Sequence, residues 1–121
     1  MINLKGGILV NSVMLVGRLT KDLEVKKLES GKEVTNLLLA VSRGYRNADG
    51  NYETDFIDCV LWDGMAKNTS EYCKKGDMVV VRGRIQTSYY VKDDITRKAT
   101  DVVVEKISFL GEKRNEIVEV G

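Results

Sequence analysis

The chain has 121 residues, of which 43% are hydrophobic and 31% charged, as is typical of one soluble globular domain rather than a membrane-spanning protein. It has no histidine, which excludes serine–histidine and cysteine–histidine catalysis, and no C-x-x-C pair for a zinc site. The net charge of +1 is unevenly distributed: residues 1–46 and 67–98 each hold eight Lys and Arg against four Asp and Glu. We therefore predict a non-enzymatic protein with local basic surfaces.

Compartment and cofactors follow from what the sequence lacks. There is no signal-peptide pattern and no stretch of roughly 18 apolar residues, so we predict a cytoplasmic protein without a membrane partner. Walker A and Rossmann motifs are absent, and neither a cofactor nor a metal is expected. Cys59 and Cys73 are predicted to be buried, reduced thiols.

The first half of the chain predicts strands joined as hairpins. A first strand is expected over 13–19, where Gly17 permits a bend or a close backbone approach. A half-buried strand over 23–27, a turn at 29–32 and a strand over 33–45 follow. The turn at 47–51 contains the strong Asp-Gly signal and leads to a strand over 52–62. Even-numbered residues of that strand are expected on one face, with Ile57, Cys59 and Leu61 on the core face.

The pattern then becomes helical, and we predict a short helix over about 63–75. Its apolar stripe comprises Met65, Ala66, Thr69, Tyr72 and Cys73. Asp63 is expected to cap the start, Lys74 and Lys75 to occupy the last turn, and Gly76 to end the helix in a left-handed conformation.

The last part of the chain returns to strands. They are predicted over 78–90 and 99–110, joined by a charged hairpin tip at 92–98 and followed by a weakly structured tail. When only the long strands are counted, three before the helix and two after it, the order β-β-β-α-β-β predicts an all-β protein with one short helix: the OB-fold, a five-stranded Greek-key barrel with the helix between its third and fourth strands. We divide the chain into an extension (1–10), the barrel domain (11–110) and a tail (111–121). For the apolar residues 8–10 we expect one of three arrangements: an extension of the first strand, a contact with another subunit, or a disordered end.

Several aromatic residues lie close to positive charge: Tyr45 beside Arg43 and Arg46, and Tyr89 and Tyr90 just after Arg82 and Arg84. Unpaired nucleic acid exposes flat bases and a charged backbone, so a surface with both features binds it without reading sequence. From composition alone, these aromatic residues are expected to be ordinary core residues, because a small barrel needs a few aromatic side chains in its core.

Strand alternation distinguishes these rings. Tyr90 shares a face with Arg82 and Arg84, opposite the valines of the same strand, which favours exposure. Phe56 shares its face with Asp58, a poor core neighbour. The aromatic residues expected to be structural are Tyr72, Tyr89 and Phe109.

Five segments of the sequence are characteristic when taken together. They are NSVMLVGRLTKD (11–22), TNLLLAVSR (35–43), DFIDCVLW (55–62), EYCKKGD (71–77) and VRGRIQT (81–87). In this order the chain from about residue 11 to residue 110 resembles the bacterial and phage single-stranded DNA-binding proteins.

The resemblance implies an OB-fold, a homotetramer, and sequence-independent protection of single-stranded DNA in replication, recombination and repair. The base-stacking positions of the family fall on Tyr45, Phe56, Trp62 and Tyr90. Phosphates are expected near Arg18, Arg43, Arg46, Arg82 and Arg84.

The C-terminus departs from the main coating proteins of that family. Residues 115–121, NEIVEVG, contain neither a Gly/Pro/Gln-rich linker nor the acidic tip that recruits other proteins. We therefore expect a phage-encoded or accessory paralogue, with replication or recombination partners not recruited through an acidic tail. An OB-fold protein-interaction module and a single-stranded RNA-binding module remain alternatives. A nuclease would need the acidic residues of 49–63 to hold a metal.

Overall fold

The computed structural model describes residues 9–110 and 117–119. Within these ranges, seven strands and one helix follow one another along the chain. They are β1 (Val13–Leu19), β2 (Lys26–Lys27), β3 (Glu33–Arg46), β4 (Tyr52–Trp62), α1 (Asp63–Tyr72), β5 (Met78–Lys92), β6 (Ile95–Leu110) and β7 (Ile117–Glu119).

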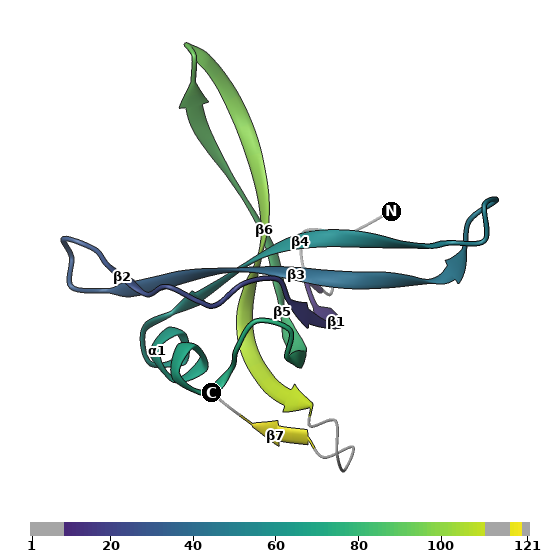
Figure 1. Cartoon of the computed structure of the whole chain (residues 1–121). Helices are drawn as coiled ribbons and strands as arrows, with labels where there is room; N and C mark the ends of the chain where they lie inside the picture. The colour runs from purple at the N-terminus through teal and green to yellow at the C-terminus, as the bar shows by residue number, and fades with distance from the viewer. Residues whose placement is uncertain (1–8, 111–116, 120–121) are drawn as a thin grey trace.

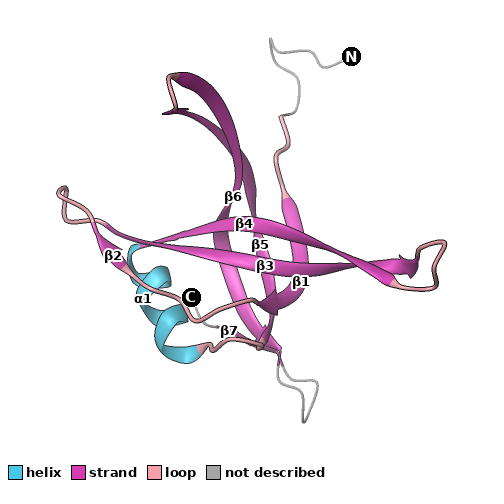
Figure 2. Ribbon diagram, turned by 45° about the horizontal axis from the view of Figure 1, so that its top comes forward, coloured by secondary structure: helices cyan, strands magenta, loops and turns pink. Residues whose placement is uncertain are grey.

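Five of the strands close into a barrel (Figure 1). β1 pairs with β5, β5 with β6, β6 with β4, β4 with β3, and β3 returns to β1. The β4–β6 pairing is parallel and the other four are antiparallel. Along the chain, helix α1 comes between the third and fourth barrel strands, β4 and β5, as predicted. It is the cyan element of Figure 2. The OB-fold prediction is confirmed.

The barrel interior is aliphatic. Its buried residues include Leu19, Leu37, Leu39, Leu61, Val79, Val81, Val102, Val104 and Ile107. Both cysteines are buried free thiols, as predicted. Burial raises the pKa of Cys59 to about 12 and that of Cys73 to about 11, so both thiols stay protonated near neutral pH.

Two hairpins extend away from the barrel in different directions, one formed by β3 and β4 and the other by β5 and β6 (Figure 1). The second is paired in register out to Lys92 and Ile95, with Asp93 and Asp94 as its turn. Both turn residues have positive φ, 55° and 61°, which a two-residue hairpin turn needs and which Asp tolerates. The predicted tip over 92–98 is therefore wrong, because residues 95–98 belong to β6.

The other turns and the first strands are close to the prediction. The strands over 13–19 and 52–62 are confirmed, and Gly31 and Gly50 take positive φ in the predicted turns. The strand predicted over 23–27 is shorter, because only Lys26–Lys27 pairs with β3. Leu23 and Val25 still pack against the core.

The helix begins as predicted but ends at Tyr72 rather than at about residue 75. The backbone of Cys73 is extended, and the amides of Lys74 and Lys75 donate to the side chains of Asp77 and Asp22 instead of to helical carbonyls. Lys74 and Lys75 are therefore not in the last helical turn.

Asp63 does not cap the helix, because Trp62 occupies the N-cap position without a side-chain cap bond. The Asp63 carboxylate instead accepts a hydrogen bond from the backbone of Glu33 at 3.1 Å. Gly76 has positive φ as predicted, but in the loop before β5 rather than directly after the helix.

The two ends of the chain are described in part. Residues 1–8 of the expected extension and 111–116 and 120–121 of the expected tail lie outside the described residues. Leu9 and Val10 do not lengthen the first strand, since β1 begins at Val13. The expectation of a weakly structured tail is wrong for residues 117–119, which form β7 and pair with β6.

Candidate nucleic-acid interface

Three aromatic side chains lie along the outer face of β4. The strand alternates as predicted, with Cys59 and Leu61 buried inside the barrel. Tyr52, Phe56 and Trp62 are on the opposite face, with exposed fractions of 57%, 62% and 39%. At about 3.3 Å per residue, Phe56 lies roughly 13 Å along the strand from Tyr52 and roughly 20 Å from Trp62. We call these three residues the outer β4 row.

Strand register brings a basic residue to the first two rings of the outer β4 row. Arg46 of β3 pairs directly with Tyr52, and its guanidinium carbon lies 5.4 Å from the ring centroid. Phe56 pairs with Ala40, which in turn pairs with Arg18 of β1. The small side chain of Ala40 thus separates the Phe56 ring from the Arg18 position on one outer face. Arg18 also donates a hydrogen bond to the Gly76 carbonyl at 2.9 Å.

Trp62 has a similar neighbourhood at the other end of the row. It pairs with Val34 of β3, which in turn pairs with Lys26 of β2. A pocket of about 350 Å³ opens beside this position. Its lining consists of Lys21, Asp22, Glu24, Lys26, Val34, Thr35 and Asn36. Each ring of the row therefore has a cation one or two strands away.

Tyr45 lies in the irregular part of β3. The β3–β4 register shifts between Ser42 and Arg46, and Gly44 takes a φ of 80° within this stretch. Tyr45 is 63% exposed. The bulge interrupts the alternation of side chains along β3 near the end of the hairpin, where Tyr45 is exposed.

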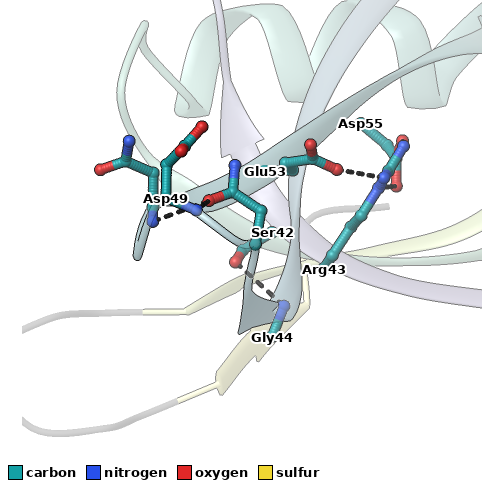
Figure 3. A network of polar contacts seen from close by, with 8 residues as sticks. Ser42, Arg43, Gly44, Asp49, Glu53 and Asp55 are labelled. Atoms are coloured by element: carbon teal, nitrogen blue, oxygen red, sulfur yellow. Dashed lines mark hydrogen bonds and ion pairs between the residues drawn. The ribbon is translucent and has the colours of Figure 1, made fainter.

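Arg43 is engaged with two carboxylates (Figure 3). Its Nη2 atom lies 2.9 Å from Oδ1 of Asp55, and its Nη1 atom forms an ion pair with Glu53. The hydrogen bond from Arg43 lowers the pKa of Asp55 below its ordinary value of 3.8. Glu53 and Asp55 are odd-numbered residues of β4, so Arg43 pairs on the face opposite Phe56. Of the predicted phosphate contacts, Arg43 is thus placed apart from the outer β4 row.

Tyr90 lies on the β5–β6 hairpin. It is 47% exposed and shares a face of β5 with Arg82 and Arg84, while Val79 and Val81 are buried on the other face. The predicted alternation between buried and exposed side chains holds from Val79 to Arg84. From Ile85 onward both faces of the strand are exposed, so the exposure of Tyr90 does not depend on that alternation. Arg84 donates to Gln86 and lies 4.0 Å from a carboxylate oxygen of Glu105.

Two aromatic residues predicted to be structural are exposed. Tyr89 is 70% exposed, because this part of the hairpin extends past the barrel and neither of its faces meets the core. Tyr72 is half exposed, with its ring edge-on to Phe109 at a centroid distance of 5.5 Å. Those two predictions were wrong, whereas Phe109 does pack against the core.

Tyr52, Lys26 and Arg97 were missed as candidates. Tyr52 was assigned to the correct face, and its spacing of four residues from Phe56 was a usable signal. Lys26 beside Trp62 and Arg97 beside Tyr90 depend on strand register, which the sequence did not specify.

The model of a family described as the single-strand binding protein family matches residues 10–110 of the chain. The chain belongs to this family. The matched residues comprise all five barrel strands and α1, including every residue of the outer β4 row.

Relatives of known name are similar over most of the chain. It is 43% identical over 107 residues to single-stranded DNA-binding protein B of Bacillus subtilis (strain 168), covering 88% of this chain and 95% of that protein. It is 43% identical to single-stranded DNA-binding protein 2 of Listeria monocytogenes, covering 90% of this chain and 69% of the relative. Identity to single-stranded DNA-binding protein 1 of Streptococcus pyogenes is 41%, with coverage of 88% and 83%.

Two further observations concern other kinds of site. Within residues 9–110 and 117–119, no three His, Cys, Asp or Glu side chains are grouped so that they could hold a metal ion. The helix in the described part of the chain is too short and too polar to cross a membrane.

Proposed function

We propose that this chain binds and protects single-stranded DNA without reading its sequence and without catalysis, in the bacterial cytoplasm, during replication, recombination and repair. The observation that carries the proposal is the outer β4 row, in which each exposed ring has a cation one or two strands away on the outside of a closed barrel. The named relatives are single-stranded DNA-binding proteins, and the same activity is proposed for residues 11–110 here, between an extension (1–10) and a tail (111–121).

Bases are proposed to stack on four exposed rings, those of Tyr45, Phe56, Trp62 and Tyr90. Stacking on an aromatic side chain contributes about 1 to 3 kcal/mol per base, so four platforms contribute about 4 to 12 kcal/mol before ordering costs. All four rings lie outside the buried core, where a flexible strand has access to them.

Phosphates are proposed to lie near Arg18, Arg43, Arg46, Arg82 and Arg84. Arg18 and Arg46 flank the outer β4 row, and Arg82 and Arg84 share a face with Tyr90. Arg84 has one carboxylate neighbour, Glu105 at 4.0 Å, whereas a phosphate at Arg43 has to compete with both Glu53 and Asp55 for the guanidinium. We expect Arg43 to contribute least to the salt dependence of binding.

The chain is also proposed to assemble as a homo-oligomer, with the tetramer that the resemblance implies. β1 pairs with β3 only at Arg18 and Leu19, and no other described strand pairs with that edge between Val13 and Gly17. Met14 and Val16 on the same strand are exposed apolar residues. An open strand edge beside exposed apolar side chains is suited to contact a second copy of the chain.

A fluorescence titration tests the proposed binding. Oligo(dT) is added to the protein at several salt concentrations while the emission of Trp62 and the anisotropy of a labelled oligonucleotide are recorded. We expect saturable binding that weakens with salt, by about 0.7 log unit per log unit of salt for each phosphate contact, and a change in Trp62 emission.

The same titration separates the alternatives. Absence of salt-sensitive binding contradicts the proposal and favours a protein-interaction module. Unchanged Trp62 emission at saturation removes Trp62 as a platform. If RNA of the same length competes as well as DNA does, the proposed activity extends to single-stranded RNA.

A further inference from the structure

Tyr52 and Arg46 form a pair at the outer end of the β3–β4 hairpin. They are cross-strand partners, and the guanidinium of Arg46 lies over the Tyr52 ring at 5.4 Å from its centroid. More than half of the Tyr52 surface remains exposed. This ring is not one of the four positions implied by the family resemblance.

The pair has the features of a nucleobase platform. Tyr52 shares one face of β4 with Phe56 and Trp62, so a strand that follows the outer β4 row from Trp62 to Phe56 meets Tyr52 next. A guanidinium on one side of an aromatic ring polarises it and offers a second flat surface on which a base can stack.

The opposite face of the same hairpin has different chemistry. There Arg43 is paired with Glu53 and Asp55 (Figure 3). At this end of the hairpin the carboxylates of β4 therefore lie on the face opposite Tyr52, whereas Asp58, between Phe56 and Trp62, is the one carboxylate on the aromatic face of β4. A polyanionic strand is repelled by exposed carboxylates and attracted by Arg46, which directs it to the Tyr52 face.

We propose that Tyr52, backed by Arg46, is an additional base-stacking platform that extends the single-stranded DNA path to the end of the β3–β4 hairpin. The inference rests on the proposed function. In this arrangement Arg46 contributes in two ways, by its contact with the Tyr52 ring and the stacked base, and by its positive charge. Because Tyr52 lies roughly 33 Å along β4 from Trp62, only a long oligonucleotide reaches both.

The test compares Tyr52→Ala with wild type over a length series of oligo(dT), with affinity measured by anisotropy and Trp62 emission recorded in parallel. For long oligonucleotides we expect binding to weaken by about 5- to 150-fold, the equivalent of one stacked base. Short oligonucleotides should bind Tyr52→Ala as they bind wild type. The change in Trp62 emission at saturation and the slope against salt should be unchanged, because no phosphate contact is removed.

Three variants serve as controls. Tyr52→Phe keeps the ring and should bind within about twofold of wild type. Tyr72→Ala removes a half-exposed tyrosine on α1, outside the proposed path, and should bind like wild type. Arg46→Ala should both weaken binding and lower the salt slope. Circular dichroism and the unfolding midpoint verify that each variant is folded.

The outcomes separate the inference from the function. If wild type shows no salt-sensitive binding, the proposed function itself fails. If wild type binds and Tyr52→Ala matches it at every length, the additional platform is wrong. Equal weakening for short and long oligonucleotides, or a similar loss in Tyr72→Ala, indicates a general structural effect and also overturns the inference.

Discussion

Gly17 and Gly83 set how closely neighbouring strands approach one another in the barrel. A Cβ atom on Gly17 would lie 2.4 Å from the carbonyl oxygen of Ala40, and one on Gly83 would lie 2.1 Å from that of Val103. Both contacts are with backbone, which moves only if a barrel strand moves. Gly64 in α1 has open space around the same position.

Gly17→Ala is therefore expected to destabilise the protein by about 1 to 3 kcal/mol, the usual cost of overpacking. Gly64→Ala is expected to be neutral or to stabilise by up to about 1 kcal/mol, because alanine favours helix. Urea unfolding of both variants gives the comparison. Equal midpoints for Gly17→Ala and wild type would show that β1 and β3 separate easily.

The sequence indicated one of these two contacts. Gly17 interrupts an apolar strand, which favours a close backbone approach, and the structure confirms it. Gly83 also lies in a strand, but its contact with Val103 depends on the β5–β6 register. That register changes beside Arg82 through a bulge, which alternation in the sequence does not reveal.

At the scale of the element, the β3–β4 hairpin is held by a polar network as well as by its ladder. The Asn47 side chain accepts hydrogen bonds from the amides of Asp49 and Asn51 in the turn. Arg43 connects to Asp55 on the adjacent strand through its Nε, 3.1 Å from Oδ2, and through its Nη2. These contacts fix the end of the hairpin that carries Tyr45 and Tyr52.

Arg43→Gln should restore the pKa of Asp55 toward its ordinary 3.8, which a carboxyl NMR titration measures directly. The folded-state pKa of Asp55 is lowered, so its pairing stabilises the protein above the ordinary carboxyl pKa, and this stabilisation is lost as pH falls through the folded pKa. Wild type should therefore exceed Arg43→Gln in stability near neutral pH, and the two should converge in acid. Arg46→Gln is the matched control. An unchanged Asp55 pKa in Arg43→Gln would contradict the pairing.

Alternation predicted the faces of β4 and β5 correctly but not the length of the hairpins. Tyr89 was assigned to the core face because it shares that face with Val79 and Val81, which were expected to be buried and are buried in the structure. Periodicity states which side chains share a face, whereas the extent of the barrel decides whether that face meets a core. The same limit explains why Ile85 is exposed.

At the scale of the whole molecule, the proposed assembly is testable through Val16. Val16→Glu places a charge beside the open edge of β1, where the side chain is exposed in the single chain, so folding should be retained. Native mass spectrometry should show an oligomer for wild type and a smaller species for the variant. Leu28→Glu, at an exposed site in the turn after β2, is the control. A monomeric wild type, or a variant of unchanged mass, contradicts this assembly.

The topology could be predicted because each signal was local. Turn residues such as Gly31 and Gly50 separated the strands, and a change of period marked the helix. The closure of the barrel through the parallel β4–β6 pair joins residues far apart in sequence, such as Cys59 and Val102, and followed only from the fold class. The cations beside Trp62 and Tyr90 depend on such pairings and were not predicted.

The regular pairing of β5 with β6 out to a two-residue turn constrains how this protein can vary in length. Inserting one residue in each strand between the barrel and Tyr90 would exchange the sides presented by Tyr89 and Tyr90. Inserting two in each strand would preserve both orientations and move the rings outward by roughly 7 Å. Natural variants of the β5–β6 hairpin should therefore differ by an even number of residues in each strand. The length of the hairpin then changes while Tyr89 and Tyr90 keep their orientations.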